Sequence, residues 1–164
     1  MRIAVIGRTR ALLESAKLLH SNGFSLPLVV TSKAAEHYRC SEEEFGRFAE
    51  TDGAKFLCTP AINGPSAFSA IRNANCDIAI SVNWVNIVEQ PVIDQFKYGI
   101  LNAHAGDLPK YRGNAPVNWA ILAGEQKVAL SIHQMQAGEL DSGDICSKYW
   151  FEMSNGEDYE DFDR

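Results

Sequence analysis

Short apolar runs and helical repeats alternate along most of the chain. Apolar runs typical of strands occupy residues 2–7, 26–30, 55–58, 77–82 and 99–103. Helical spacing predicts helices at residues 11–21, from a capping box at 41–44 to a stop at 52–53, around 66–73, and for a turn or two after Pro91. The run Ile78-Ala79-Ile80 is continuous, which is typical of strands buried on both faces. Repeated strand–helix units predict a parallel sheet with right-handed crossovers.

The pattern changes after residue 103. Asn114 is suited to cap a helix with Pro116 in its first turn, running through Trp119 to Gly124. Strands follow at 127–134 and 144–151, joined by a loop too short for a crossover, so they should pair antiparallel. The predicted fold class is α/β, with a mostly parallel sheet flanked by helices and an antiparallel strand pair at the C-terminal end. A chain of 164 residues suffices for one domain, which we place at 1–151.

The negative charge of the chain is concentrated at its end. Residues 152–164 hold six acids and one arginine, which leaves −1 of the total −6 for residues 1–151. The main body therefore has no basic stripe for a phosphate backbone, and a nucleic-acid partner is disfavoured. No apolar run has membrane-spanning length, and the N-terminal run is too short for a signal peptide, so we expect a cytoplasmic protein. The scattered cysteines predict reduced thiols and no metal site.

Candidate chemistry lies at the end of the fifth predicted strand. Asn102 and His104 are two apart and project from one face of that strand, at the edge where open α/β sheets bind ligands. Asp141 lies in the loop between the last two strands. An amide donor beside an imidazole and a carboxylate suits polar chemistry on a carbonyl. The alternatives are a structural histidine closing the strand and an aspartate in a local turn with Ser142; His133 is assigned to supporting structure.

Two other functions are disfavoured. The segment 7–12 after the first strand lacks the GxGxxG pattern, and the second strand ends without the acid that would hold a ribose, so dinucleotide binding is unsupported. No serine or cysteine stands in a strained, glycine-flanked elbow, which argues against a covalent enzyme intermediate. The polar residues Asn102, His104 and Asp141 instead favour direct transfer of a group, without an enzyme-bound intermediate.

The motifs at the fifth strand and after it resemble the folate-dependent formyltransferase family. They are Asn102-Ala103-His104, then Leu108-Pro109-x-Tyr111-Arg112-Gly113, then Leu140-Asp141-Ser142-Gly143-Asp144-Ile145. The resemblance runs from residue 1 to about 151 and is specific from 77 to 145. It implies a Rossmann-like core, N10-formyltetrahydrofolate as formyl donor, and Asn102, His104 and Asp141 as the catalytic residues.

The loop and the helix after it are most similar to those of sugar N-formyltransferases, which act on nucleotide-linked amino sugars in cell-surface glycan biosynthesis. The loop His104-Ala105-Gly106-Asp107-Leu108-Pro109 departs from the commoner His-x-Ser-Leu-Leu-Pro. Residues 81–84 and 114–122 carry the rest of this likeness. Glycinamide ribonucleotide and methionyl-tRNA remain alternative acceptors.

The resemblance also implies where the substrates bind. The formyl donor is expected at Ser81, Val82, Asn83, Trp84, Ile87, Gln136, Ala137, Gly138, Glu139, Leu140 and Asp144. The acceptor is expected at Asp107, Lys110, Arg112 and Asn114, with a solvent-exposed loop as the alternative. The expected partners are these small molecules, and a homodimer is one assembly left open.

The implied mechanism is direct attack of a neutral amine on the formyl carbon. Asn102 and protonated His104 would donate to the developing oxyanion, and Asp141 would orient His104 and help remove the amine proton through water. Family members normally continue beyond this point, so residues 152–164 are expected to start a truncated C-terminal element. A folate-binding remnant without turnover is therefore a further alternative.

Overall fold

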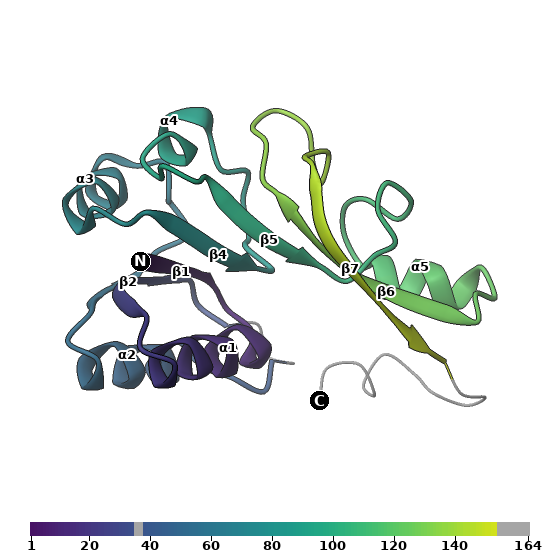
Figure 1. Ribbon diagram of the computed structural model, residues 1–164, viewed down its shortest axis with the longest axis horizontal. Helices are drawn as coiled ribbons and strands as arrows, with labels where there is room; N and C mark the ends of the chain where they lie inside the picture. The colour runs from purple at the N-terminus through teal and green to yellow at the C-terminus, as the bar shows by residue number, and fades with distance from the viewer. Residues whose placement is uncertain (35–37, 154–164) are drawn as a thin grey trace.

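The computed structural model describes residues 1–34 and 38–153. Its strands form one seven-stranded sheet in the order β3-β2-β1-β4-β5-β6-β7 (Figure 1). The strands from β3 to β5 pair in parallel, whereas β6 and β7 pair antiparallel. The predicted α/β fold class is confirmed. The strands are β1 (Arg2–Gly7), β2 (Ser25–Thr31), β3 (Lys55–Cys58), β4 (Ile78–Val82), β5 (Ile100–His104), β6 (Lys127–Gln134) and β7 (Ile145–Glu152).

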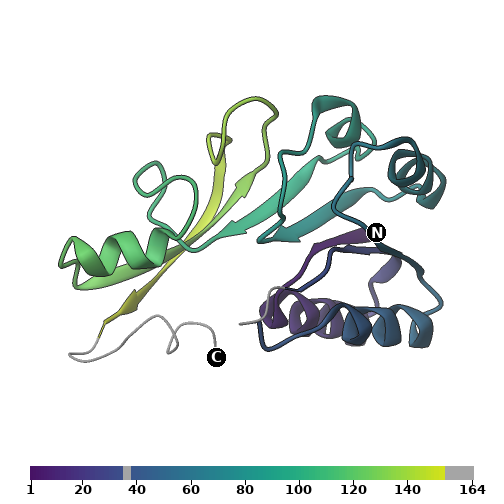
Figure 2. The same cartoon turned by 180° about the vertical axis from the view of Figure 1, so that it is seen from behind.

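Helices cover both faces of the parallel strands. Helices α1 and α2 lie on one face and α3 and α4 on the other, while α5 runs beside β6 (Figure 1 and Figure 2). This layered arrangement follows from the strand–helix alternation of the sequence. The helices are α1 (Arg10–Ser21), α2 (Glu42–Thr51), α3 (Pro65–Ala74), α4 (Gln90–Ile93) and α5 (Pro116–Leu122).

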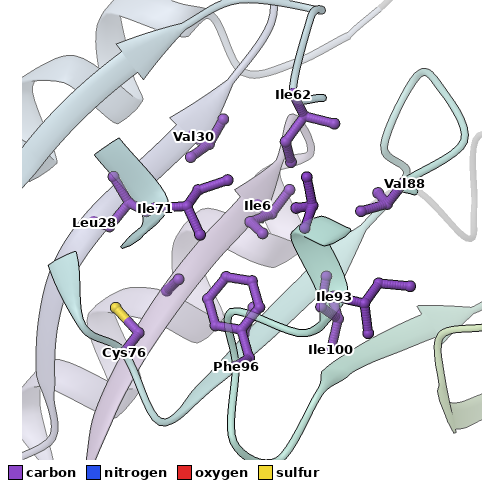
Figure 3. Packing of buried hydrophobic residues seen from close by; sticks show 13 residues of the cluster. Ile6, Leu28, Val30, Ile62, Ile71, Cys76, Val88, Ile93, Phe96 and Ile100 are labelled. Carbon is purple, nitrogen blue, oxygen red and sulfur yellow. The ribbon is translucent and has the colours of Figure 1, made fainter. Parts of the chain in front are cut away.

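One hydrophobic core fills the space between the sheet and helices α3 and α4 (Figure 3). Alternate residues of the central strand β1, Ala4 and Ile6, point into this core, while Ile3 and Val5 point into the other. A continuous apolar run is therefore needed on β1, because both of its faces are covered. The members of this core are Ala4, Ile6, Leu28, Val30, Ile62, Ile71, Cys76, Ala79, Val88, Val92, Ile93, Phe96 and Ile100.

The second core lies under α1 and α2. Its largest fully buried side chain is Phe45 of α2, which is 1% exposed. The capping box predicted for α2 is confirmed: the backbone N–H of Ser41 donates to Glu44 Oε2 over 2.9 Å. This hydrogen bond, together with the nearby Arg10, lowers the pKa of Glu44. The cap fixes the start of α2, so that Phe45 faces the sheet.

The C-terminal end of the sheet is antiparallel, as the sequence predicts. Helix α5 packs on β6 through Val117, Ala120 and Val128. The cap predicted at Asn114 is wrong by one residue. Ala115 is the residue before the helix, in a left-handed conformation with φ of 53°, and this turn leaves Asn114 exposed.

The end of the chain is described up to Met153. Strand β7 ends at Glu152, the first residue of the predicted acidic tail, and residues 154–164 of that tail lie outside the described residues. Within the described ranges, no helix is long and apolar enough to cross a membrane.

Candidate functional site

The candidate site lies at the carboxyl end of β5, where the parallel half of the sheet meets β6. Asn102 and His104 project from one face of β5, and Asn102 is paired in register with His133 of β6. The loop between β6 and β7 brings Asp141 within 3.4 Å of a ring nitrogen of each histidine. One amide, two imidazoles and one carboxylate thus meet from three different segments.

Asn102 lies between the carboxylate and the second histidine. Its Nδ2 is 3.5 Å from Asp141 Oδ1, to which it donates, and 3.1 Å from His133 Nε2. The other ring nitrogen of His133, Nδ1, donates to the backbone oxygen of Gln134 over 2.9 Å, because a carbonyl only accepts. His133 is almost completely buried. Its ring is therefore held from one side while it supports the Asn102 amide on the other.

His104 is held at both ring nitrogens. Nε2 donates to the backbone oxygen of Tyr111 over 2.7 Å, so this nitrogen carries a proton. Nδ1 lies 3.4 Å from Asp141 Oδ2, and the residue is only 7% exposed. Gly106 makes the first contact possible, because a Cβ there would lie 2.7 Å from Nε2 and 2.8 Å from the Tyr111 oxygen. The loop after β5 therefore closes tightly around the imidazole.

Asp141 is the shared partner of the cluster. Its φ is 51°, a left-handed conformation, and its Oδ2 accepts the backbone N–H of Gly113 over 2.9 Å. Burial alone would raise the pKa of Asp141. The contact with His133, the Gly113 N–H and the nearness of the His104 and His133 rings outweigh burial, so the pKa of Asp141 lies below its ordinary value. Asp141 is thus held as a carboxylate facing both histidines.

This arrangement is suited to reactions in which negative charge develops on a carbonyl oxygen. Amide and ring N–H groups fixed in a poorly hydrated place stabilise such charge without reorganising. The carboxylate can orient an imidazole and accept a proton through water. Across residues 1–34 and 38–153, no group of three or more His, Cys, Asp or Glu side chains is arranged to hold a metal ion.

A cavity of about 570 Å³ opens beside the cluster. Its lining includes Asn102, His104, His133 and Asp141. Such a volume lies within the usual range for small-molecule sites. The predicted donor-binding residues that line it are Val82, Asn83, Trp84, Ile87, Gln136, Gly138, Glu139 and Leu140. The structure therefore brings most of the predicted donor site together with the catalytic candidates.

Three predicted donor-binding residues lie outside this lining. Ser81 is buried, with 1% exposure. Ala137 packs against the core under α3 and α4. Asp144 is exposed, and its backbone oxygen accepts the N–H of Gln134 over 2.9 Å. Ser81 and Ala137 are therefore more closely associated with the protein interior than with the cavity.

Of the four predicted acceptor residues, Asn114 lines the cavity, whereas Asp107, Lys110 and Arg112 lie outside its lining. Each charged residue of this set already has a partner of opposite charge: Asp107 binds Lys148, Lys110 binds Glu125, and Arg112 binds Glu139. The two cations expected to meet a phosphate are thus occupied in this state of the protein.

His133 is the residue of the cluster whose partner the sequence did not reveal. Its place within a strand, between Ile132 and Gln134, predicts a supporting role, which its burial and its contact with Asn102 fit. The missing information was the register of β5 and β6, which pairs His133 with Asn102. The predicted antiparallel strand pair did not include β5, so this neighbour was not apparent.

Comparison with known proteins identifies the family of this chain. A family model described as formyl transferase matches residues 1–164, the whole chain. The chain belongs to the formyl transferase family. Among curated relatives, the methionyl-tRNA formyltransferase of Caldanaerobacter subterraneus subsp. tengcongensis is 31% identical over 152 residues, covering 90% of this chain and 49% of the relative. This formyl transferase chain therefore spans about half the length of the curated relatives it matches.

Solved structures share the fold. Phosphoribosylglycinamide formyltransferase from Bacillus halodurans superposes with a TM-score of 0.81 at 15% identity, covering 99% of this chain and 85% of that one. The sugar 3N-formyl transferase WlaRD, solved in the presence of dTDP and 5-N-formyl-THF, superposes with a TM-score of 0.66 at 20% identity, covering 93% and 52%. At these identities the likeness establishes that the formyl transferase chain has the Rossmann-like fold of these enzymes.

Proposed function

We propose that this formyl transferase chain transfers the formyl group of N10-formyltetrahydrofolate to the amine of a nucleotide-linked amino sugar. The observation that carries the proposal is the convergence of Asn102, His104 and Asp141 on one cavity wall. Family membership supplies the reaction class, and the cluster supplies groups suited to it.

The cavity suits a folate. Trp84, Ile87 and Leu140 give it apolar walls, and Ile87 and Leu140 are more than half exposed. Apolar side chains left open at a cavity are typical of a surface that a flat ring covers. Residues 82–84, Gln136 and 138–140 line the same space, and we propose their peptide groups as the donors and acceptors for a pterin edge. When bound, the folate supplies an activated formyl group.

The residues of the chain then act on the carbonyl oxygen and on the amine. Asn102 Nδ2 and the Nε2 proton of His104, which the Tyr111 oxygen holds in the resting site, are the donors available to that oxygen. Loss of one such donor typically costs about 10²- to 10³-fold in rate. Asp141 keeps His104 oriented and, through water, accepts the proton that the attacking amine loses. As the new bond from the amine to the formyl carbon forms, the bond from that carbon to N10 of the folate would break, and the same proton would pass through water to N10.

The charge distribution favours a small acceptor. Residues 1–151 have a net charge of −1, and the basic side chains Lys110 and Arg112 beside the site are neutralised by Glu125 and Glu139. Binding to a nucleic-acid backbone depends on cations that are available to phosphates. These features argue against a nucleic-acid backbone, and the sugar-type motif at 104–122 supports a nucleotide-linked amino sugar as the acceptor. Methionyl-tRNA is the second candidate, because curated relatives that are 31% and 30% identical carry that activity in their names.

An acceptor panel tests the proposal. Tetrahydrofolate release from N10-formyltetrahydrofolate is measured with dTDP- and UDP-linked amino sugars, glycinamide ribonucleotide and methionyl-tRNA, and folate binding is measured separately by calorimetry. We expect release only with an amino sugar. Release only with methionyl-tRNA or glycinamide ribonucleotide would overturn the acceptor assignment. Folate binding without release from any acceptor would identify a folate-binding remnant and overturn the proposed activity.

A further inference from the structure

We infer that Lys148 of β7 is a positioning residue that holds the loop after β5 against His104 and Asp141. This inference rests on the proposed formyl transfer. Lys148 itself is not part of the cavity lining. It acts through the loop, at a distance from the substrates.

The lysine anchors the loop at two points. Its Nζ donates to Asp107 Oδ1 and to the backbone oxygen of Leu108, each over 2.6 Å. The side chains of Lys148 and Asp107 are 24% and 30% exposed, so water shields this pair less than it shields a fully exposed one. Trp150, two residues along β7, lies 5.5 Å from Nζ by its ring centroid. The hydrogen bond to Leu108 holds the backbone of the loop, whereas the one to Asp107 holds a side chain.

A second anchor at the same turn comes from β6. Ser131 Oγ donates to the Gly106 oxygen over 2.7 Å and accepts the Leu108 N–H over 3.4 Å. Ser131 is completely buried and Leu108 is 1% exposed. The start of the loop is therefore held between β6, through a hydroxyl, and β7, through an ammonium group.

The anchored loop then supplies both contacts that fix the reactive groups. Tyr111 presents its backbone oxygen to His104 Nε2 over 2.7 Å, and Gly113 presents its N–H to Asp141 Oδ2 over 2.9 Å. These residues follow Leu108 by three and five positions. If the loop shifts, both contacts change together, because one backbone segment carries them. Lys148 is thus linked to the orientation of His104 and Asp141 through a short run of backbone.

The other ion pairs of this loop have a different character. Lys110 binds Glu125 and Arg112 binds Glu139 at side chains that are mostly exposed, and neither pair includes a backbone oxygen of the loop. Exposed pairs of this kind are worth little. Lys148 is accordingly the charged residue on which we expect the loop geometry to depend most.

The test compares Lys148→Met with Lys127→Met. Lys127 is a matched control, because it lies on neighbouring β6 and forms an exposed ion pair with Glu152. We expect Lys148→Met to lower kcat about 10- to 100-fold, the scale of a small misplacement of reacting groups, with the KM for N10-formyltetrahydrofolate changed less than about threefold. Lys148→Arg should recover part of kcat, and Lys127→Met should match the wild type. Asp107→Asn and Lys148→Met should be non-additive in kcat.

Hydrogen exchange gives a readout that does not need activity. We expect the amide of Gly113 to lose about tenfold or more of its protection in Lys148→Met, while amides of β1 keep theirs. Unchanged Gly113 protection would overturn the inference, whether or not the wild type is active. So would a kcat within twofold of wild type in Lys148→Met. A wild type that transfers no formyl group to any acceptor overturns the proposed function alone.

Discussion

The two halves of the sheet use their buried positions differently. In the parallel half, the side chains that fill the two cores are apolar, as Ile6 and Phe45 illustrate, and the buried polar residues Thr31, Ser32 and Ser81 lie at or beside the carboxyl ends of strands. In the antiparallel half, β6 buries Ser131 and His133 with Val128 and Ala129. Apolar side chains of similar volume can replace one another in a core, whereas a buried hydrogen-bonded group depends on its particular partners. The two large apolar cores thus lie in the first half, and buried polar groups of the candidate site lie in the second.

Strand β5 belongs to both halves. Ile100 at its start is fully buried in the core under α3 and α4. Asn102 and His104 follow on the same face, at the cavity. The same alternation that puts Ile100 into the core therefore directs the two polar side chains into the site, and a rigid strand positions them.

The largest effect is expected for Asp141→Asn, which should abolish most formyl transfer and leave the parallel half folded. Asparagine keeps an oxygen for the Gly113 N–H but loses the charge that faces His104 and His133. Transfer should fall on the order of 10²- to 10⁴-fold. Steady-state tetrahydrofolate release measures this, with Asp94→Asn, at the end of α4, as the control. Equal loss in both variants would argue against a special role for Asp141.

The opposite result, a loss of stability without a loss of formyl transfer, is expected for Phe45→Ala. This change should lower the free energy of unfolding by about 3–5 kcal/mol, the usual cost of truncating a buried aromatic side chain. Urea unfolding at pH 7 measures it, and Phe45→Leu should cost less. At a temperature where the variant remains folded, kcat should match the wild type. A large loss of kcat in the fully folded variant would show that the two halves are not separable.

A smaller effect concerns acid stability. The pKa of Asp141 is lower in the folded protein than in the unfolded chain, so its carboxylate stabilises the native state above the unfolded pKa of about 4. This contribution is lost as the pH falls through the lower, folded pKa. The stability gap between wild type and Asp141→Asn should therefore be present at pH 7 and 5 and shrink below about pH 4. Urea unfolding at each pH measures the gap, and a gap that grew with acid would contradict the assigned direction.

The smallest effect is expected at the cap of α2. Ser41→Ala should lower the free energy of unfolding by about 1 kcal/mol, because the capping box loses one of its side chains. Ser66→Ala, at an exposed position in the first turn of α3, is the control. Thermal unfolding of the two variants measures the difference in their stability. Transfer at 25 °C should be unchanged in both variants, and a selective loss of transfer in Ser41→Ala would contradict the separation of the halves.

The sequence allowed prediction of what depends on local pattern. Strands β1, β3 and β6 have the predicted bounds, because apolar runs and flanking turns determine them. The cap of α5 was misplaced, since Ala115 adopts a left-handed conformation that its residue type does not favour. His133 and Lys148 could not be recognised from pattern alone. Their roles come from strand register and from a loop that folds back on β7, and both depend on contacts between distant segments.

The most direct test of the account is a comparison of His104→Ala with the wild type in tetrahydrofolate release and in folate binding. His20→Ala, an exposed histidine of α1, is the control. The account predicts that transfer falls at least about 10²-fold in His104→Ala, while the folate Kd changes less than about threefold. Transfer at the wild-type rate in folded His104→Ala would contradict it.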